Sequence, residues 1–250
     1  MFDYGWLDAH CHLTDERIFH NLVEEISAAE EEGVSGFVSS VLCEEEYNLI
    51  THKDFEKYDK FIEWSAGIHP FYEKSSERDF DALVELCERK RIIAVGEIGL
   101  DKRNNDFEWQ KKVLLKQLDL AKNYHLPVIF HIVKQHYEIY KIIKNDFPKI
   151  FGFIHGFSAS KEIFELYSKF DLALSLNLRL PEKEVVKLVL KRGFYLVETD
   201  APYLKERGSA DEFNHLKNLS KVAKNIERLT GISAEEIKKK QFENFKSIFG

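Results

Sequence analysis

The sequence predicts one α/β domain built as a TIM-like (β/α)8 barrel. Short apolar runs alternate with longer amphipathic stretches from one end of the chain to the other. The length of 250 residues is ordinary for a single barrel of this kind. No repeat, low-complexity tract or linker rich in Pro, Gly or Ser divides the chain. We therefore expect a single domain over residues 1–250.

The apolar runs supply eight candidate strands. In chain order they are Gly5–His10, Val34–Ser40, Phe61–Ile68, Ile92–Glu97, Pro127–His131, Ile150–His155, Leu172–Leu176 and Phe194–Thr199. Eight strand–helix units in this length match a closed eight-stranded barrel. An open doubly wound sheet is the structural alternative. No glycine-rich phosphate motif follows the first strand, which counts against that alternative.

The segments between the strands have helical periodicity. Apolar residues share one helix face in three of them: Ile18, Leu22, Ile26 and Ala29; Leu114, Leu115, Leu118 and Ala121; and Phe213, Leu216, Val222, Ala223, Ile226 and Leu229. The third stripe stops at Gly231, which we expect to cap that helix. Ser233 followed by Glu236 predicts a capping box for a final helix.

The composition limits the class of protein. A hydrophobic fraction of 44% is enough for a large core, and a charged fraction of 32% is enough for a soluble surface. No apolar run approaches the roughly 18 residues that span a bilayer. The N-terminus lacks the basic start and apolar stretch of a signal peptide. We expect a cytoplasmic protein with no membrane association, and nothing points to an obligate protein partner.

Charge and cysteine content narrow the functions further. The formal net charge of −7 argues against a broad electrostatic grip on nucleic acid. It leaves a nucleic-acid substrate open, because bound divalent metals would add local positive charge. The three cysteines are scattered and form neither a disulfide framework nor a CxxC zinc motif.

The most informative feature is the position of the histidines and acidic residues. His10 and His12 follow the first strand, and residues two apart in an extended chain point to the same side. Cys11 then faces the other way, toward the helix layer. Active sites form where the carboxyl ends of barrel strands meet. We therefore expect convergence at the mouth of His10 and His12 with four residues that end later strands, namely Glu97, His131, His155 and Asp200.

This set of side chains predicts a metal centre. An unpaired carboxylate at the end of a buried strand is costly, and a divalent cation would stabilise Glu97 and Asp200 together. Four imidazoles and two carboxylates suit zinc, manganese, cobalt, nickel or iron, and tolerate magnesium at the carboxylate-rich side. Six ligands are too many for one small open site. We expect one or two ions and favour two, with Glu97 as the bridge.

The predicted chemistry is hydrolysis. Two ions roughly 3.5–4 Å apart would activate a water and stabilise a phosphoryl or acyl oxyanion. Asp200 is positioned to take the proton of the attacking water as a general base. Glu97 and Asp200 are therefore the candidate catalytic residues. No Ser, Cys or Lys stands out as a covalent nucleophile.

Six ordered motifs resemble those of the TatD-type metal-dependent deoxyribonucleases, a family of the amidohydrolase-like superfamily. They are Asp8-Ala9-His10-Cys11-His12-Leu13, Gly67-Ile68-His69-Pro70, Val95-Gly96-Glu97-Ile98-Gly99-Leu100-Asp101, Leu126-Pro127-Val128-Ile129-Phe130-His131, His155-Gly156-Phe157-Ser158 and Glu198-Thr199-Asp200-Ala201-Pro202-Tyr203-Leu204. The resemblance runs the whole length of the chain. It implies a β/α barrel, one or two divalent metals and hydrolysis of DNA phosphodiesters. It also implies metal binding by His10, His12, Glu97, His131, His155 and Asp200.

The chain departs from the family pattern in its substrate region. The family usually has Ser-Arg after the histidine of the fifth strand, where this chain has Ile132-Val133. Gly156 stands where the family usually has Cys. The loop after Arg207-Gly208 does not match. These departures touch the substrate shell and leave the metal ligands intact.

Three further residues are candidates at the mouth. His69 follows the third strand, and we expect it to bind substrate phosphate or to hydrogen-bond within the site. Asp101 and Arg103 follow Glu97 on the same loop. They would orient a ligand or contact phosphate, with a simple loop salt bridge as the alternative.

Other candidates have a plainer explanation. Lys134 could replace the missing arginine, although a solvated helix lysine is favoured. Trp109 and Phe157 could stack on bases, with core packing as the default. His136 and His215 are expected at the surface.

Three functions remain open. The first is a metal-dependent nuclease. The second is a small-molecule hydrolase, such as an amidase, lactonase or phosphoesterase, on the same dinuclear site, which the altered loops and acidic charge favour somewhat. The third is a non-catalytic metal-binding or interaction protein, against which the intact ligand set argues.

Overall fold

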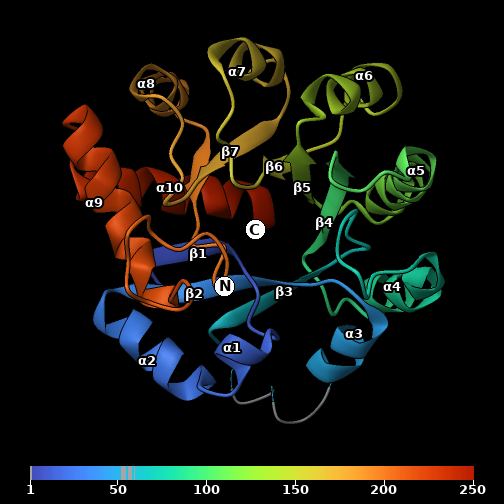
Figure 1. Ribbon diagram of the computed structural model, residues 1–250, viewed down its shortest axis with the longest axis horizontal. Helices are drawn as coiled ribbons and strands as arrows, with labels where there is room; N and C mark the ends of the chain where they lie inside the picture. The colour runs from blue at the N-terminus through green and yellow to red at the C-terminus, as the bar shows by residue number, and fades with distance from the viewer. Residues whose placement is uncertain (1, 52–54, 56–57, 59) are drawn as a thin grey trace.

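The computed structural model describes residues 2–51, 55, 58 and 60–250, and their fold is the predicted barrel (Figure 1). Eight parallel strands follow one another around the sheet in chain order. This order excludes the doubly wound alternative, whose strand order reverses direction. The strands are β1 (Trp6–Cys11), β2 (Val34–Val41), β3 (Ile62–Ala66), β4 (Ala94–Asp101), β5 (Val128–Val133), β6 (Gly152–Ile154), β7 (Leu172–Leu176) and β8 (Tyr195–Val197).

Helices surround the strands. They are α1 (Glu16–Phe19), α2 (Leu22–Glu31), α3 (Glu44–Ile50), α4 (Phe80–Glu88), α5 (Phe107–Tyr124), α6 (His136–Asp146), α7 (Lys161–Tyr167), α8 (Lys183–Arg192), α9 (Leu219–Thr230) and α10 (Ala234–Phe249), with 3₁₀ turns η2 (Glu77–Asp79) and η3 (Leu216–Asn218). The boundary prediction at Gly231 is confirmed, since that residue ends α9 with φ of 83°. Ser233 caps α10 by accepting the amide of Glu236 at 3.2 Å.

Two predicted helical stripes are divided in the structure. Ile18 lies in the separate α1, because the chain leaves the helix at His20 and Asn21 before α2 begins. Phe213 lies in a loop and Leu216 in η3, so the third stripe is regular only within α9. These residues pack on the core all the same. Apolar spacing therefore predicted their burial correctly and their helix boundaries wrongly.

The barrel has two apolar layers, because successive strand residues point to opposite faces. One face of each strand packs against the helices, as Val95 and Leu100 of β4 do. The other face fills the barrel interior. The interior layer consists of Leu7, Ala9, Val38, Ala94, Ile129, Phe153, Ala173 and Leu196.

The seam between β1 and β8 closes through hydrogen bonds between the segment after β8 and residues 8–12, at the end of β1 and just after it. Asp200 N donates to His10 O at 2.9 Å, and His12 N donates to Ala201 O at 2.7 Å. Thr199 N donates to the buried carboxylate of Asp8 at 2.9 Å. The predicted ligand residues of both strands are therefore held side by side by backbone hydrogen bonds.

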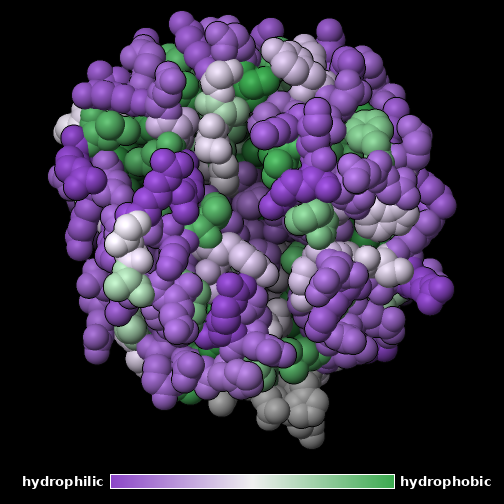
Figure 2. Space-filling model, in the orientation of Figure 1, coloured by the Kyte–Doolittle hydropathy of each residue, from purple (hydrophilic) through white to green (hydrophobic). Residues whose placement is uncertain are grey.

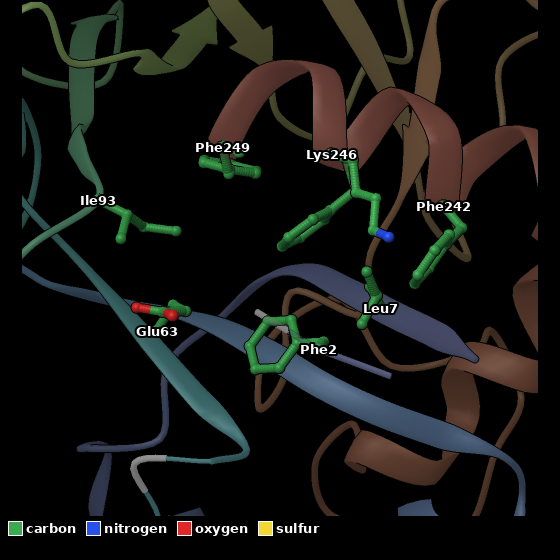
Figure 3. Close-up of a pocket in the computed structure, with 9 residues that line it drawn as sticks. Phe2, Leu7, Glu63, Ile93, Phe242, Lys246 and Phe249 are labelled. Carbon is green, nitrogen blue, oxygen red and sulfur yellow. The ribbon is translucent and has the colours of Figure 1, made fainter. Parts of the chain in front are cut away.

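The amino end of the barrel is covered by α10, which crosses the ring of strands (Figure 1). Gln241 and Asn244 donate to strand carbonyls, at Leu7 O (2.8 Å) and Tyr195 O (2.8 Å). A cavity of about 170 Å³ remains under the helix. Figure 3 shows the side chains that point into it, among them Phe2, Leu7, Ile93, Phe242 and Phe249.

The outer surface is mostly hydrophilic and is hollowed near the middle of the ring of helices (Figure 2). Among the described residues, no helix is both long enough and apolar enough to cross a membrane. The three cysteine thiols are free and buried. The cytoplasmic location stays a prediction.

Candidate metal centre

A shift in the register of β1 against β2 turns His10 and His12 toward the mouth of the barrel. Leu7 and Ala9 face the barrel interior, so unbroken alternation would turn Cys11 inward as well. The register against β2 shifts between Asp8 and Cys11. Cys11 consequently joins the helix-side core, with its thiol 3.6 Å from Val38 O, as the sequence predicted. His10 and His12 are left pointing into the mouth.

Glu97 also points into the mouth because of a register shift. It lies in the middle of β4 and not at the strand's end as predicted, and the register against β5 shifts between Gly96 and Ile98. Ala94 faces inward and Val95 outward, yet Ile98 also faces outward, so Glu97 is turned inward. The bulge brings β4 close to β5. A side chain at Gly99, whose φ is 156°, would collide with the carbonyl of His131.

The two oxygens of Glu97 face different histidines. Oε2 lies 3.2 Å from His10 Nε2 and 3.6 Å from His12 Nε2. Oε1 lies 2.7 Å from His155 Nε2 and in short contact with His131 Nδ1. The carboxylate therefore stands between two groups of imidazoles, one from each side of the barrel.

Asp200 completes the group on the Oε2 side. Its Oδ1 lies 3.6 Å from His10 Nε2 and 3.4 Å from His12 Nε2. The residue has φ of 55°, a left-handed conformation that few non-glycine residues adopt, and it is kept there by the seam hydrogen bonds. All six predicted ligand residues thus meet in one cluster at the mouth.

The cluster is buried, and its charges depend on one another. His10 is inaccessible to solvent, and Glu97 is 3% exposed. Burial by itself would raise the pKa of Glu97, but His155 and its neighbouring histidines hold that pKa well below the usual range. Burial would likewise raise the pKa of Asp200, and the hydrogen bond with His12 lowers it instead. The neighbouring histidines therefore favour the ionised form of both carboxylates.

Two of the imidazoles, those of His10 and His131, contact a second group outside the cluster of six. Ser40 Oγ lies 3.2 Å from His10 Nδ1 and 2.6 Å from Ser65 Oγ. Asp101 Oδ2 lies 2.9 Å from His131 Nε2. Such partners fix the ring orientation and tautomer of metal-binding histidines.

Glu198 supports His155 and was missed by the sequence analysis. It is fully buried, its Oε1 lies 3.5 Å from His155 Nδ1, and it accepts the amide of Gly156 at 2.6 Å and Asn177 Nδ2 at 3.1 Å. The available signal was its position two residues before Asp200, which puts both on the inward face of the chain. Ser40 and Ser65 gave no comparable signal, because serines in strands are common.

These residues fit a divalent cation. His10 Nε2 is buried and, among the described residues, has no hydrogen-bond partner of acceptable geometry, although two carboxylate oxygens lie within 3.6 Å. Donor atoms lie within 4.8 Å of one another in three sets: His10, His155 and Asp200; His10, His12 and Glu97; and His69, Glu97 and His131. Nitrogen and carboxylate ligands converging at this separation suit transition-metal ions.

His69 differs from the other histidines of the cluster. Its Nδ1 accepts the backbone amide of Phe71 at 2.9 Å, so the ring is neutral with its proton on Nε2. Burial, and after it the charge of His131, lowers the pKa of His69 to about 4. Nε2 lies 3.4 Å from Glu97 Oε1. In this tautomer His69 presents a hydrogen-bond donor, and not a lone pair, to the centre.

Two of the remaining candidates at the mouth, Asp101 and Arg103, contact each other. Arg103 pairs with Asp101 through Nε at 2.9 Å, while Asp101 also holds His131. The loop salt bridge is therefore confirmed for Asp101, which also contacts His131, while the orientation of a ligand by Asp101 stays a prediction. Lys134 is exposed with φ of 55° in the turn before α6, so it is not the helix lysine that was favoured.

The expected positions of two aromatic residues and two further histidines can be compared with the structure. Phe157 is buried in the core, as its default predicted, and Trp109 is half-buried in α5. His136 and His215 were expected at the surface, and both are only partly exposed. His136 is half-buried against Phe157 and Tyr167, with ring centroids 6.4 and 5.7 Å away. His215 is half-buried because its Nδ1 lies 2.6 Å from Glu25 Oε1.

Histidines and carboxylates gathered at the carboxyl end of an eight-stranded β/α barrel define the class of barrel metal-dependent hydrolases. The particular family follows from sequence. The family model described as TatD related DNase matches residues 7–250, and the chain belongs to that family.

Relatives match along nearly their whole length. An uncharacterized metal-dependent hydrolase, YabD of Bacillus subtilis, is 31% identical over 97% of this chain and 98% of its own. The 3'-5' ssDNA/RNA exonuclease TatD of Pantoea ananatis is 26% identical over 100% of this chain and 99% of its own. The crystal structure of YjjV, a TatD homologue of Escherichia coli, superposes with a TM-score of 0.88 at 28% identity, covering 98% of this chain and 97% of that one.

Proposed function

We propose that this protein is a divalent-metal-dependent deoxyribonuclease that cleaves DNA phosphodiester bonds with an activated water. The observation that supports this most directly is the division of Glu97 between two groups of histidines. The family and the relatives named as nucleases support DNA as the substrate.

Two ions would be held on either side of Glu97. His10, His12 and Asp200 face Oε2 and would hold one of them. His131 and His155 face Oε1 and would hold the other. A carboxylate shared between two cations would also explain why an acidic side chain is buried among the histidines of the mouth.

When bound, the ions lower the pKa of a water and offset the negative charge that develops on a phosphodiester. Asp200 would take the proton of the attacking water, since it is ionised and stands beside His10 and His12. His69 would donate a hydrogen bond from its Nε2–H group to a phosphate oxygen, because its Nδ1 already accepts a hydrogen bond from Phe71 N. Asp101, Ser40 and Glu198 would keep the histidines aligned.

The choice of metal is proposed on ligand chemistry. The imidazole-rich set suits zinc, manganese, cobalt or nickel, with magnesium best accommodated by the carboxylates. The test is to strip the protein with a chelator and to reload it with one metal at a time. Each loaded form is assayed on a single-stranded oligonucleotide, a simple phosphodiester, and a panel of small esters and amides.

The assay separates three functions. We expect cleavage of the oligonucleotide and of the simple phosphodiester, together with a higher melting temperature in the loaded protein. Activity on small esters or amides alone would support a small-molecule hydrolase. That second candidate has one observation in its favour, since the apolar pair Ile132-Val133 stands where the family pattern is polar. Inactivity in all assays, with metal bound, would support a non-catalytic role.

A further inference from the structure

Two exposed aromatic rings flank the candidate centre, one beside each half of it. Phe71 is 44% exposed, and its backbone amide is bonded to His69 on the Oε1 side of Glu97. Tyr203 is 38% exposed, and its ring lies edge-on to His12 on the Oε2 side, with 5.2 Å between centroids. Large exposed rings this close to buried ligands cannot be explained by core packing.

Each of these rings has a guanidinium over it. Arg103 Cζ lies 4.3 Å from the centroid of Phe71, and Arg17 Cζ lies 4.7 Å from that of Tyr203. Both arginines are themselves about half exposed, at 54% and 44% of the side chain. The two pairs come from different segments: Phe71 and Arg103 lie in the loops after β3 and β4, whereas Arg17 lies in α1 after β1 and Tyr203 in the loop after β8.

Aspartates hold both arginines in place. Arg17 is bidentate to Asp15, at 2.8 and 2.7 Å, and Tyr203 Oη donates to the same carboxylate at 3.2 Å. Arg103 contacts Asp101. Asn104 Nδ2 donates to Pro70 O at 2.7 Å, which connects the loop of Arg103 to the loop of Phe71. Among the described residues, no hydrogen bond reaches Nη1 of Arg103, so that edge is available to an anion.

We propose that Phe71 with Arg103, and Tyr203 with Arg17, are the substrate-positioning pairs of the proposed nuclease. The nucleotides on the two sides of the scissile phosphate would stack their bases on the two rings, and the arginines would face the neighbouring phosphates. This inference rests on the proposed function and adds the residues that select a nucleic acid. It also implies that these two bases must be unpaired, because a base in a duplex has no free face for the ring.

The two ring–arginine pairs bear on two features of the sequence that argue against a nucleic-acid substrate. A net charge of −7 gives no general attraction for nucleic acid. Because each arginine is paired with an aspartate, the two pairs would contribute positioned hydrogen-bond donors beside the centre and no net positive charge. The arginine of the family pattern after His131 is replaced by Val133. Arg103, after β4, and Arg17, in α1, would place a guanidinium near the same centre.

The test compares leucine variants of the two rings on matched substrates. Phe71→Leu and Tyr203→Leu are assayed with a single-stranded oligonucleotide and with an oligonucleotide of the same length that is abasic around the cleavage site. We expect each variant to raise KM for the base-containing strand about tenfold, with kcat changed less than about twofold, because uniform binding is lost. The abasic strand is expected to show little change. Tyr203→Phe keeps the ring but loses the hydrogen bond to Asp15, so we expect its KM for the base-containing strand to lie between those of the wild type and Tyr203→Leu.

The control is Tyr124→Leu, which removes a ring of similar exposure, 37%, at the far end of α5. Metal content is measured in every variant to confirm that the proposed ligand His12, beside Tyr203, is undisturbed. Equal losses on both strands, or no change in KM, would overturn the stacking roles while the nuclease proposal stands. A wild-type protein that cleaves a simple phosphodiester but no oligonucleotide would also overturn them, and one that cleaves no phosphodiester would overturn the proposed function first.

Discussion

The two ends of this barrel are built from the same strands and have opposite character. At the carboxyl end, buried histidines surround Glu97 and Asp200. At the amino end, Phe245 and Ile248 of α10 close the barrel over an apolar layer. Ile129 and His131, or Phe153 and His155, are two residues apart on the same inward face. Two residues along a strand therefore separate the apolar interior layer from the polar centre.

The difference indicates where stability and activity reside. Burial of apolar side chains at the amino end stabilises the fold. Burial of charged groups at the mouth opposes folding unless a cation or a proton neutralises them. We therefore expect substitutions at the mouth to cost activity with little loss of stability, and substitutions at the amino end to do the reverse.

The largest effect is expected from Glu97→Gln. The variant keeps its shape but loses the charge and one ligand oxygen on which both halves of the centre depend. We expect kcat/KM to fall at least about a thousandfold, roughly 4 kcal/mol of activation free energy. Glu63→Gln, at the opposite end of the barrel, is the matched control and is expected to remain active. Near wild-type turnover by the Glu97 variant at saturating metal would rule out the bridge.

Asp200→Asn should have the next largest effect. Asparagine retains an oxygen ligand but is not basic, so we expect kcat to fall by about a hundredfold to a thousandfold while much of the metal affinity survives. The measurement is kcat across pH at full metal occupancy. An unchanged pH profile with normal turnover would leave Asp200 as a ligand alone.

Phe245→Ala probes the amino end. This side chain is 5% exposed in the interior cluster, and its loss should lower the free energy of unfolding by about 3 kcal/mol. The melting temperature should fall by about 6–12 °C, as followed by circular dichroism. We expect kcat of the folded variant to stay within about twofold. A large loss of kcat at low temperature would show that the two ends are coupled.

The smallest expected effect is that of Asp101→Asn. The aspartate orients His131 from behind, and loss of such a partner weakens metal affinity by about 10- to 100-fold. Excess metal should then restore activity, which a titration followed by turnover would reveal. Glu25→Gln removes a carboxylate from another histidine, His215, away from the mouth, and is the control. Equal affinity in both variants would contradict the orienting role.

The sequence by itself determined the fold and which residues meet at the mouth. Alternating apolar runs and helical stripes predicted the barrel, and barrel topology sends the ends of all strands to one place. His10, His12, His131, His155 and Asp200 could be found for that reason, since each lies near the carboxyl end of a strand. The apolar positions of helices were also predictable, because their spacing reflects burial whether or not the helix is continuous.

Only the tertiary structure decided how those residues face one another. Strict alternation from Ala94 would turn Glu97 outward, and the register shift in β4 turns it inward instead. The tautomer of His69 depends on the amide of Phe71, and the alignment of His155 on Glu198. A pattern along one strand records which side chains are buried. Register shifts and hydrogen bonds between strands depend on packing across the barrel, which no single segment of the sequence encodes.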